Sequence, residues 1–466
     1  MRISHFLYFI TVVLISCFIS FLATGCAQIG APTGGPKDSI PPELVSATPK
    51  LLSTNFTGSK VILVFNEYVD VLDIQTNLLV SPFPKTNPQV DFKLKTVTVK
   101  LKDTLLENTT YAINFGNAIR DNNEGNPFRN FTYVFSTGKT IDSLQLGGQV
   151  IIAETGKKDS TIIAMLYRNV DDSAVQKRKP NYIAKLDSSG NFKFTNLSAG
   201  SYKVYALKDG DGGKTYNSKI ELFGFADSEV IVSDSTATIT LYAFEEEKDI
   251  KKSTVATPAK TGAQADKKLK YISSLSSNVQ DLLTDLLLTV NRPLKTFDPQ
   301  KIILTDTNYN KINSTNTIDS TQKIIRISTK WKEESQYRLL VGKDAISDST
   351  GTELSKSDTI RFTTKKNADY GSIVLRFSNL KLAEHPVLQF VKDQEIYRSV
   401  AITAATWSDK LFPPGDYELR ILFDSNNNGK WDRGNYSQKL QPEKAITLDT
   451  KLNIKANWDN ERDVKL

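Results

Sequence analysis

The chain has 466 residues, of which 39% are hydrophobic and 24% are charged, and it carries a formal net charge of +7. This length exceeds what a single hydrophobic core supports and predicts about three or four domains. Because basic and acidic side chains are interspersed, the charge favours a solvated surface, and no nucleic-acid partner is expected. Two cysteines and two histidines are too few for a disulfide framework or for a zinc site made of several such ligands.

The N-terminal stretch has the parts of a secretory signal, which are a basic residue at Arg2, an apolar run over residues 6–22 and small residues before a break. The small residues lead straight into a cysteine, and Leu22-Ala-Thr-Gly-Cys26 resembles a bacterial lipobox. The resemblance implies that residues 1–25 are a lipoprotein signal peptide and that Cys26 becomes the acylated, palmitate-bearing first residue of the mature protein. The alternative is an uncleaved anchor, since about 17 apolar residues just reach across a bilayer.

The segment after the lipobox changes from a tether to a series of predicted strands. Residues 26–42 are rich in Gly, Pro, Ser and Thr, which predicts a flexible tether. Residues 43–138 contain short apolar or alternating segments separated by turn-rich links, a spacing typical of a β-sandwich. Three motifs in this stretch resemble the strand motifs of the bacterial Ig-like domain of the S-layer type: Phe65-Asn-Glu-Tyr-Val-Asp70, Leu106-Glu-Asn-Thr-Thr-Tyr111 and Phe135-Ser-Thr137.

A second predicted module covers residues 143–244. Its segments 146–152, 161–167 and 182–186 are predicted to be strands. Gly190-Asn-Phe-Lys-Phe194 and Leu197-Ser-Ala-Gly-Ser-Tyr202 resemble motifs of carboxypeptidase-regulatory or collagen-adhesin B-type domains. The resemblance implies another small Ig-like β-sandwich, of a kind that serves as a spacer or stalk.

The second half of the chain repeats the first. Residues 245–270 lose all apolar periodicity, which predicts a disordered hinge. The pattern then restarts, with residues 337–348 matching 111–121 and residues 411–422 matching 197–207. We therefore predict an all-β fold with four tandem Ig-like β-sandwich modules in two pairs. The second pair consists of an Ig-like domain at 271–365 and a regulatory-like β-sandwich at 366–466.

The whole arrangement resembles multi-domain Ig-like lipoproteins of Bacteroidetes, whose mature start is similar to residues 26–38. The resemblance implies a lipid-anchored protein. Residue 27 is Ala and not the Asp that, by resemblance to other lipoproteins, would imply retention in the inner membrane, so we expect an anchor in the outer membrane; the face of the membrane that the protein occupies stays open.

One loop carries a candidate calcium motif, Asp424-Ser-Asn-Asn-Asn-Gly-Lys-Trp-Asp432. Asp424, Asn426, Asn428 and Asp432 occupy positions one, three, five and nine, and Gly occupies position six, as in the first part of an EF-hand loop. Position twelve is Asn435, where a bidentate Glu is expected, so an Asx- and Gly-rich hairpin turn is the alternative. The corresponding loop of the second module keeps a weaker version with Asp209, Asp211 and Asn217.

The sequence offers little to a catalytic mechanism. His385 lies beyond the predicted signal and stands alone, no free thiol follows Cys26, and no G-x-S-x-G motif occurs. We therefore expect a non-enzymatic, lipid-anchored scaffold or adhesin-like protein of the cell envelope that binds an unidentified protein or glycan. The alternative is an accessory lipoprotein of an outer-membrane barrel complex for assembly, secretion or nutrient uptake. No cofactor is expected apart from the candidate calcium ion.

Overall fold

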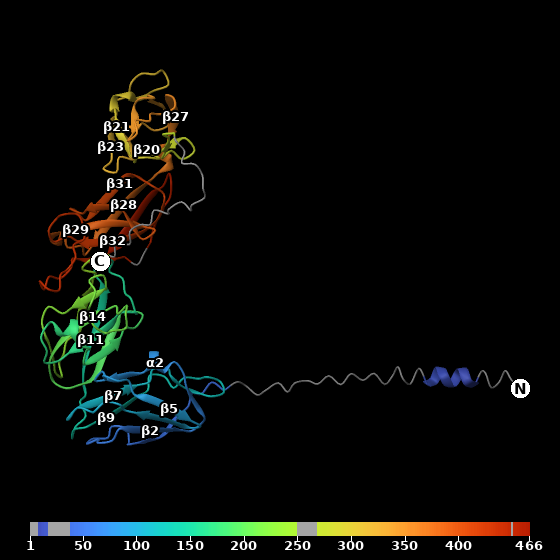
Figure 1. Cartoon of the computed structure of the whole chain (residues 1–466), viewed down its shortest axis with the longest axis vertical. Helices are drawn as coiled ribbons and strands as arrows, with labels where there is room; N and C mark the ends of the chain where they lie inside the picture. The colour runs from blue at the N-terminus through green and yellow to red at the C-terminus, as the bar shows by residue number, and fades with distance from the viewer. Residues whose placement is uncertain (1–7, 17–37, 249–267, 449–450) are drawn as a thin grey trace. The chain divides into compact units, whose positions relative to one another are not determined.

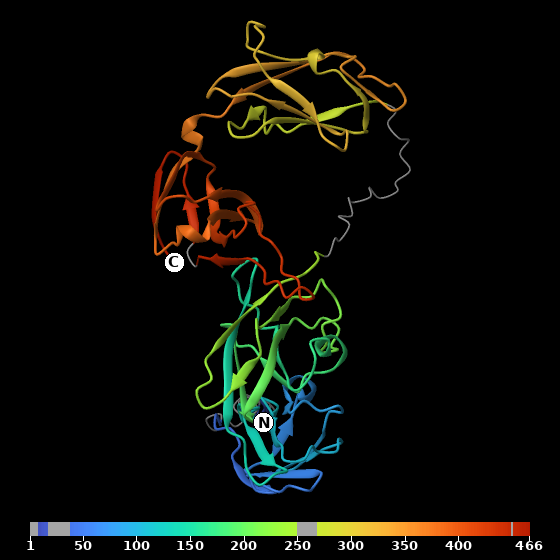
Figure 2. The same cartoon turned by 90° about the vertical axis from the view of Figure 1, so that its left-hand side faces the viewer.

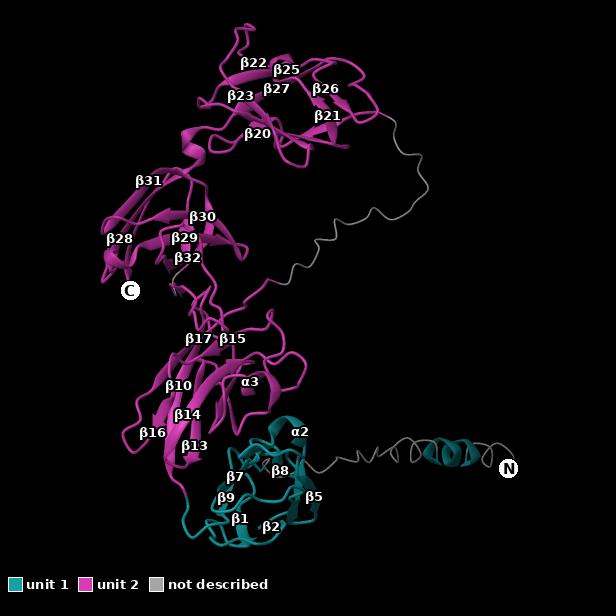
Figure 3. Ribbon diagram, turned by 60° about the vertical axis from the view of Figure 1, so that its left-hand side comes forward, with its two compact units in different colours: residues 1–141 teal, residues 142–466 magenta. Residues whose placement is uncertain are grey.

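The structure is a computed structural model that describes residues 8–16, 38–248, 268–448 and 451–466. The chain divides into two compact units, residues 1–141 and 142–466 (Figure 3). Residues 8–16 are helical, and none of the helices in the described part of the chain is long and apolar enough to span a bilayer. Cys26, most of the predicted tether and residues 249–267 of the predicted hinge lie outside the described residues.

The first module, in unit 1, is a β-sandwich. One sheet has the strand order β1-β2-β6-β5, the other has the order β4-β7-β9, and β3 pairs with β8 (Figure 1). Side chains from both sheets fill one core, since every second residue of β2 is buried and faces the residues of β7 and β9. The elements are β1 (Leu44–Thr48), β2 (Lys60–Phe65), β3 (Val69–Val71), α2 (Ile74–Asn77), β4 (Leu79–Ser81), β5 (Gln89–Lys93), β6 (Thr96–Lys100), β7 (Thr110–Asn114), β8 (Ile119–Asp121) and β9 (Thr132–Ser136).

The third module, in unit 2, repeats the strand order of the first and adds one strand, β19, to its second sheet. Its sheets run β18-β20-β24-β23 and β19-β27-β25-β22, and β21 pairs with β26. These sheets form the two facing layers drawn in yellow and orange in Figure 2. The elements are β18 (Tyr271–Ser273), β19 (Val279–Gln280), β20 (Leu286–Val290), β21 (Leu294–Phe297), η1 (Pro299–Lys301), β22 (Ile302–Thr305), β23 (Thr315–Ile318), β24 (Ile324–Ser328), β25 (Gln336–Val341), β26 (Ile346–Asp348) and β27 (Asp358–Thr364).

The second module begins unit 2 and has a different topology. A sheet with the order β13-β10-β17 faces a sheet with the order β12-β11-β14-β15, and β16 also pairs with β14. Its first and last strands, β10 and β17, are parallel. The elements are β10 (Leu144–Ile152), β11 (Ile163–Tyr167), α3 (Ala174–Lys177), β12 (Tyr182–Lys185), β13 (Asn191–Leu197), β14 (Gly200–Leu207), β15 (Phe223–Phe225), β16 (Val230–Val232) and β17 (Ile239–Ala243).

The fourth module repeats the second strand by strand. Its sheets run β31-β28-β35 and β30-β29-β32-β33, β34 also pairs with β32, and the first and last strands are again parallel. The elements are η2 (Asn367–Asp369), β28 (Gly371–Ser378), η3 (Leu382–Glu384), β29 (Pro386–Lys392), β30 (Glu395–Ala401), β31 (Thr406–Phe412), β32 (Gly415–Phe423), β33 (Lys444–Thr447), β34 (Leu452–Ile454) and β35 (Asp459–Lys465). The predicted fold class, tandem Ig-like β-sandwiches in two pairs, is therefore confirmed.

A buried tyrosine fixes the same corner in the first and third modules. The hydroxyl of Tyr111 accepts the backbone N–H of Leu106 at 2.7 Å. The hydroxyl of Tyr337 accepts the backbone N–H of Lys332 at 3.2 Å, again five residues earlier. Each tyrosine is the second residue of its strand, β7 or β25, so the bond ties the preceding loop to the sheet.

A different tyrosine bond recurs in the second and fourth modules. Tyr202 donates to the carbonyl of Ser198 at 3.0 Å, and Tyr417 donates to the carbonyl of Pro413 at 3.1 Å, both four residues earlier. Both tyrosines have 0% exposure, and each follows a glycine, Gly200 or Gly415, with a positive φ. The two kinds of module thus keep distinct corner chemistry, which agrees with the strand orders.

Candidate functional site

The candidate calcium loop joins β32 to β33, and Asp424 organises its first half. Asp424 is only 2% exposed, and its carboxylate accepts the backbone N–H groups of Asn428 at 3.2 Å and Gly429 at 2.6 Å. Gly429 has φ +74°, and no atom lies within 4 Å of the position that a Cβ would occupy. Glycine is therefore favoured here by the positive φ and not by steric crowding. The carboxylate therefore folds the loop around itself.

The structure brings the other three predicted residues together. The side-chain amides of Asn426 and Asn428 both donate to Asp432, at 2.5 and 2.7 Å. Their amide oxygens accept the backbone N–H groups of Asn428 and Lys430. A calcium ion bound here would have to draw on oxygens that already close the turn, and the prediction of calcium binding stays a prediction.

Glu443 also belongs to this loop and was missed by sequence reasoning. Its carboxylate accepts the backbone N–H and the hydroxyl of Ser425, both at 2.7 Å, and the backbone N–H of Asp432 at 3.1 Å. Asn435, at the twelfth position of the motif, instead forms a separate turn with Leu440. Glu443 lies outside the motif spacing, so no signal in the sequence could have assigned it to the loop.

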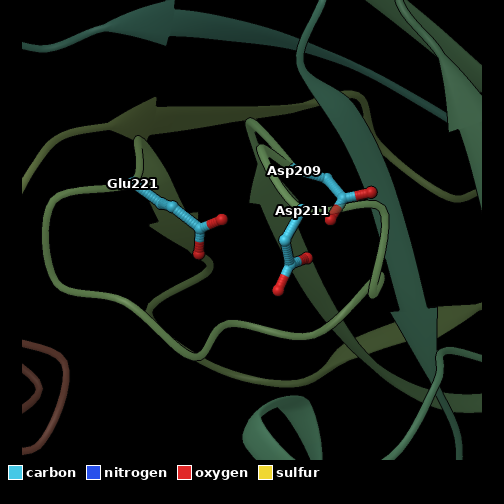
Figure 4. A group of neighbouring side chains, drawn as sticks. All are labelled: Asp209, Asp211 and Glu221. Carbon is cyan, nitrogen blue, oxygen red and sulfur yellow. The ribbon is translucent and has the colours of Figure 1, made fainter.

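The corresponding loop of the second module holds three neighbouring carboxylates, Asp209, Asp211 and Glu221 (Figure 4). One oxygen of each lies within 4.8 Å of the others. Asp209 forms an ion pair with Lys214, and Asp211 accepts the side-chain amide of Asn217 at 2.7 Å. Glu221 was missed by sequence reasoning because it enters from the far end of the loop, next to β15.

The pKa values of two carboxyl groups in this cluster are shifted in opposite directions. Burial raises the pKa of Glu221, and the nearby charges of Asp211 and Asp209 add to the shift. The hydrogen bond from Asn217 lowers the pKa of Asp211. Calcium takes six to eight oxygen ligands, so three carboxylates would need backbone carbonyls or water to complete a site.

Calcium should raise the melting temperature of the protein if the Asp424 loop binds it. At a hundredfold excess over its Kd, a ligand stabilises the folded state by about 2.7 kcal/mol, which corresponds to several degrees. We expect Asp424→Ala to abolish the shift between calcium and chelator, and Asp209→Ala to leave most of it. The measurement is differential scanning calorimetry, and an unchanged melting temperature of the wild type with calcium would contradict the prediction.

His385 lies beside the same loop. It is in the left-handed region at φ 49°, and its carbonyl accepts the backbone N–H of Asp424 at 3.2 Å. Both residues line a cleft of about 410 Å³ that also includes Ser399 and Thr403.

The fold and the site define a tandem β-sandwich protein, and the comparisons with known proteins refine its first module. Residues 38–137 match the bacterial Ig-like domain family. No curated protein matches the chain.

Solved structures resemble the chain only weakly. They include an α2-macroglobulin fragment of Escherichia coli that spans domains MG0-NIE-MG1, with 16% identity, 40% of this chain and 72% of that one covered, and a TM-score of 0.21. The TIE protein of Bacillus anthracis has 10% identity, coverage of 93% and 76%, and a TM-score of 0.17. The N-terminal part of the bacterial S-layer protein SbsC has 16% identity, coverage of 44% of each chain, and a TM-score of 0.17.

Proposed function

We propose that this protein is a non-enzymatic, lipid-anchored scaffold of the cell envelope that presents its Ig-like modules to a protein or glycan. The observation that carries the proposal is the twofold repeat of two β-sandwich types, each with its own filled core. A chain built of repeated cores gains length and surface with each module, as suits a spacer or a presenter. The lipobox-like stretch at Cys26 supports attachment to the outer membrane.

Edge strands supply a surface for a protein partner. β1 and β18 are terminal strands in equivalent sheets of the first and third modules. Each exposes a large aliphatic side chain, Val45 at 65% and Ile272 at 77%. A partner strand that adds to such an edge gains main-chain hydrogen bonds and covers the exposed side chain. We therefore favour an extended segment of a partner protein as the ligand of these edges.

The test compares the native lipoprotein, purified in mild detergent, with the Val45→Lys/Ile272→Lys double variant. We expect a partner to co-purify with the wild type and to be depleted about tenfold or more with the variant, because lysine on an edge strand opposes pairing. The matched control is Ile231→Lys, which changes an exposed isoleucine of β16 in the second module. Equal recovery with all three proteins would contradict the edge-strand proposal.

The same purification distinguishes the alternative function. A stoichiometric outer-membrane barrel in the eluate would favour an accessory role in assembly, secretion or nutrient uptake. Protease treatment of intact cells would then show which face of the membrane the modules occupy.

A further inference from the structure

The second and fourth modules share a hydrophobic cluster inside unit 2. Tyr436, from the loop between β32 and β33 of the fourth module, is only 5% exposed. Its ring lies among four aromatic rings of the second module: Tyr205 at 5.9 Å, Tyr216 at 6.3 Å, Phe223 at 5.1 Å and Phe225 at 5.3 Å between centroids. All four pairs are edge-to-face, an arrangement that aromatic quadrupoles favour. Tyr436 therefore fills a pocket of another module and not of its own.

The hydroxyl of Tyr436 is also satisfied by the second module. It lies 3.0 Å from the hydroxyl of Tyr205 and donates to the carbonyl of Asp172 at 2.8 Å. Its backbone N–H donates to Glu246 at 2.6 Å. Burial raises the pKa of Tyr436 to about 12, so the hydroxyl stays a donor at neutral pH. A buried polar group with all its partners in place fixes one arrangement of the two modules.

Ion pairs and hydrogen bonds surround the cluster. Lys439 pairs with Asp172 at 3.0 Å, and Lys157 pairs with Glu418 at 2.7 Å. The side-chain amide of Gln441 donates to the carbonyl of Phe225 at 2.9 Å and to Asp227 at 2.7 Å. Each of these contacts joins the second module to the fourth. The interface thus has the apolar centre and polar rim of a specific protein contact.

The two modules approach each other closely at two glycines. A Cβ on Gly434 would lie 2.5 Å from the ring of Phe244, and a Cβ on Gly156 would lie 2.6 Å from the carbonyl oxygen of Ala445. The backbone N–H of Ala445 donates to the carbonyl of Ala153 at 2.9 Å. The turn after β10 therefore covers part of β33, which is an edge strand of its sheet.

We propose that the loop of residues 424–443 is a fastener that docks the fourth module onto the second module of the same chain, so that these two modules act as one body. This loop is the red segment that reaches the green second module in Figure 2. The covalent path between the two modules runs through residues 245–365, which include the whole third module. The docked loop links the second and fourth modules directly. A force that pulls these two modules apart is therefore carried by their interface and not by the third module.

The docked arrangement is independent of the lipid anchor and of the proposed partner. Tyr436, Gly434 and Gly156 hold the two modules together, although no sequence motif marks these residues. The second and fourth modules therefore do not move freely relative to each other, although residues of a predicted hinge separate them in the sequence.

Zero-length carbodiimide crosslinking of the full chain tests the proposal, because both interface ion pairs join a lysine to a carboxylate. We expect Lys157–Glu418 and Lys439–Asp172 crosslinks in the monomer band, identified by mass spectrometry. The Lys208–Asp159 pair, at 3.0 Å within the second module, serves as an internal control of folding. Absence of both interface crosslinks, or their presence in crosslinked dimers alone, would overturn the proposal.

A wedge variant opens the interface without removing a core side chain. Asparagine tolerates positive φ, so Gly156→Asn keeps its turn but places a Cβ against Ala445. We expect the yield of both interface crosslinks to fall at least tenfold while the Lys208–Asp159 crosslink persists. The matched control is Gly212→Asn in the same module, which has φ +80° and no atom within 4 Å of its Cβ.

Tyr436→Ala provides a second variant that acts from the fourth module. We expect the same loss of both interface crosslinks, with Trp458→Ala, an exposed aromatic of that module, as its control. Retention of the interface crosslinks in both Gly156→Asn and Tyr436→Ala would show that the ion pairs form without the fastener and would overturn its role.

Discussion

Replacing Cys26 with serine should move the protein from the membrane fraction to the soluble fraction and remove its palmitate label. If residues 22–26 are a lipobox, the thiol of Cys26 is the group that accepts the lipid, and serine has no thiol. Each buried methylene contributes about 0.8 kcal/mol, so an acyl chain with a dozen buried methylenes contributes about 10 kcal/mol. The loss of two or three such chains should therefore change the partition almost completely.

The chain contains its own matched control for this experiment. Cys17 is the other cysteine of the sequence and lies in the apolar run before the lipobox. Cys17→Ser should leave both acylation and membrane attachment intact. If Cys26→Ser stayed in the membrane fraction without a palmitate label, the apolar run would be an uncleaved anchor and the lipid proposal would be wrong.

The sequence predicted the architecture because the repeat recurs at the level of local chemistry. Tyr111 and Tyr337 stand at equivalent strand starts, and the structure gives their hydroxyls equivalent hydrogen bonds. Alternation of buried and exposed residues marks the strands, and turn residues mark their ends. These signals act over a few residues, so they can be read without knowledge of distant contacts.

The interface between the second and fourth modules could not be read in this way. Tyr436 and Tyr205 are 231 positions apart, yet their hydroxyls lie 3.0 Å from each other. In sequence, Tyr436 is an ordinary aromatic in a polar loop and Gly156 an ordinary turn glycine. Their roles depend on the shape of a surface from another module, which no periodicity encodes.

The acidic loops show the same division between local and distant information. Motif spacing grouped Asp424, Asn426, Asn428 and Asp432. In the structure the side-chain amides of the two asparagines donate to Asp432, and the carboxylate of Asp424 accepts the backbone N–H of Asn428. The carboxylate of Glu443 joins them only because β33 pairs with β32 and returns the chain to the start of the loop. Spacing can therefore predict a turn, whereas the complete ligand set of a site depends on strand pairing.

Phe135→Ala should destabilise the first module selectively and leave the stability of unit 2 unchanged. Phe135 in β9 has 0% exposure, and its ring lies 4.4 Å from that of Phe56 and 5.3 Å from that of Tyr111. Truncation of a buried phenylalanine costs about 3–5 kcal/mol, and a domain is stable by only about 5–15 kcal/mol. We expect one calorimetric transition to fall by more than about 10 °C and the others to stay in place.

The reciprocal variant separates loss of one core from general destabilisation. Phe362 in β27 of the third module is 3% exposed and lies 5.7 Å from the rings of both Tyr337 and Trp331. Phe362→Ala should lower a transition that Phe135→Ala leaves unchanged, because the two rings belong to separate cores in separate compact units. Equal shifts of all transitions in both variants would show that the two units unfold together. The modules would then share a repeated fold without having independent stabilities.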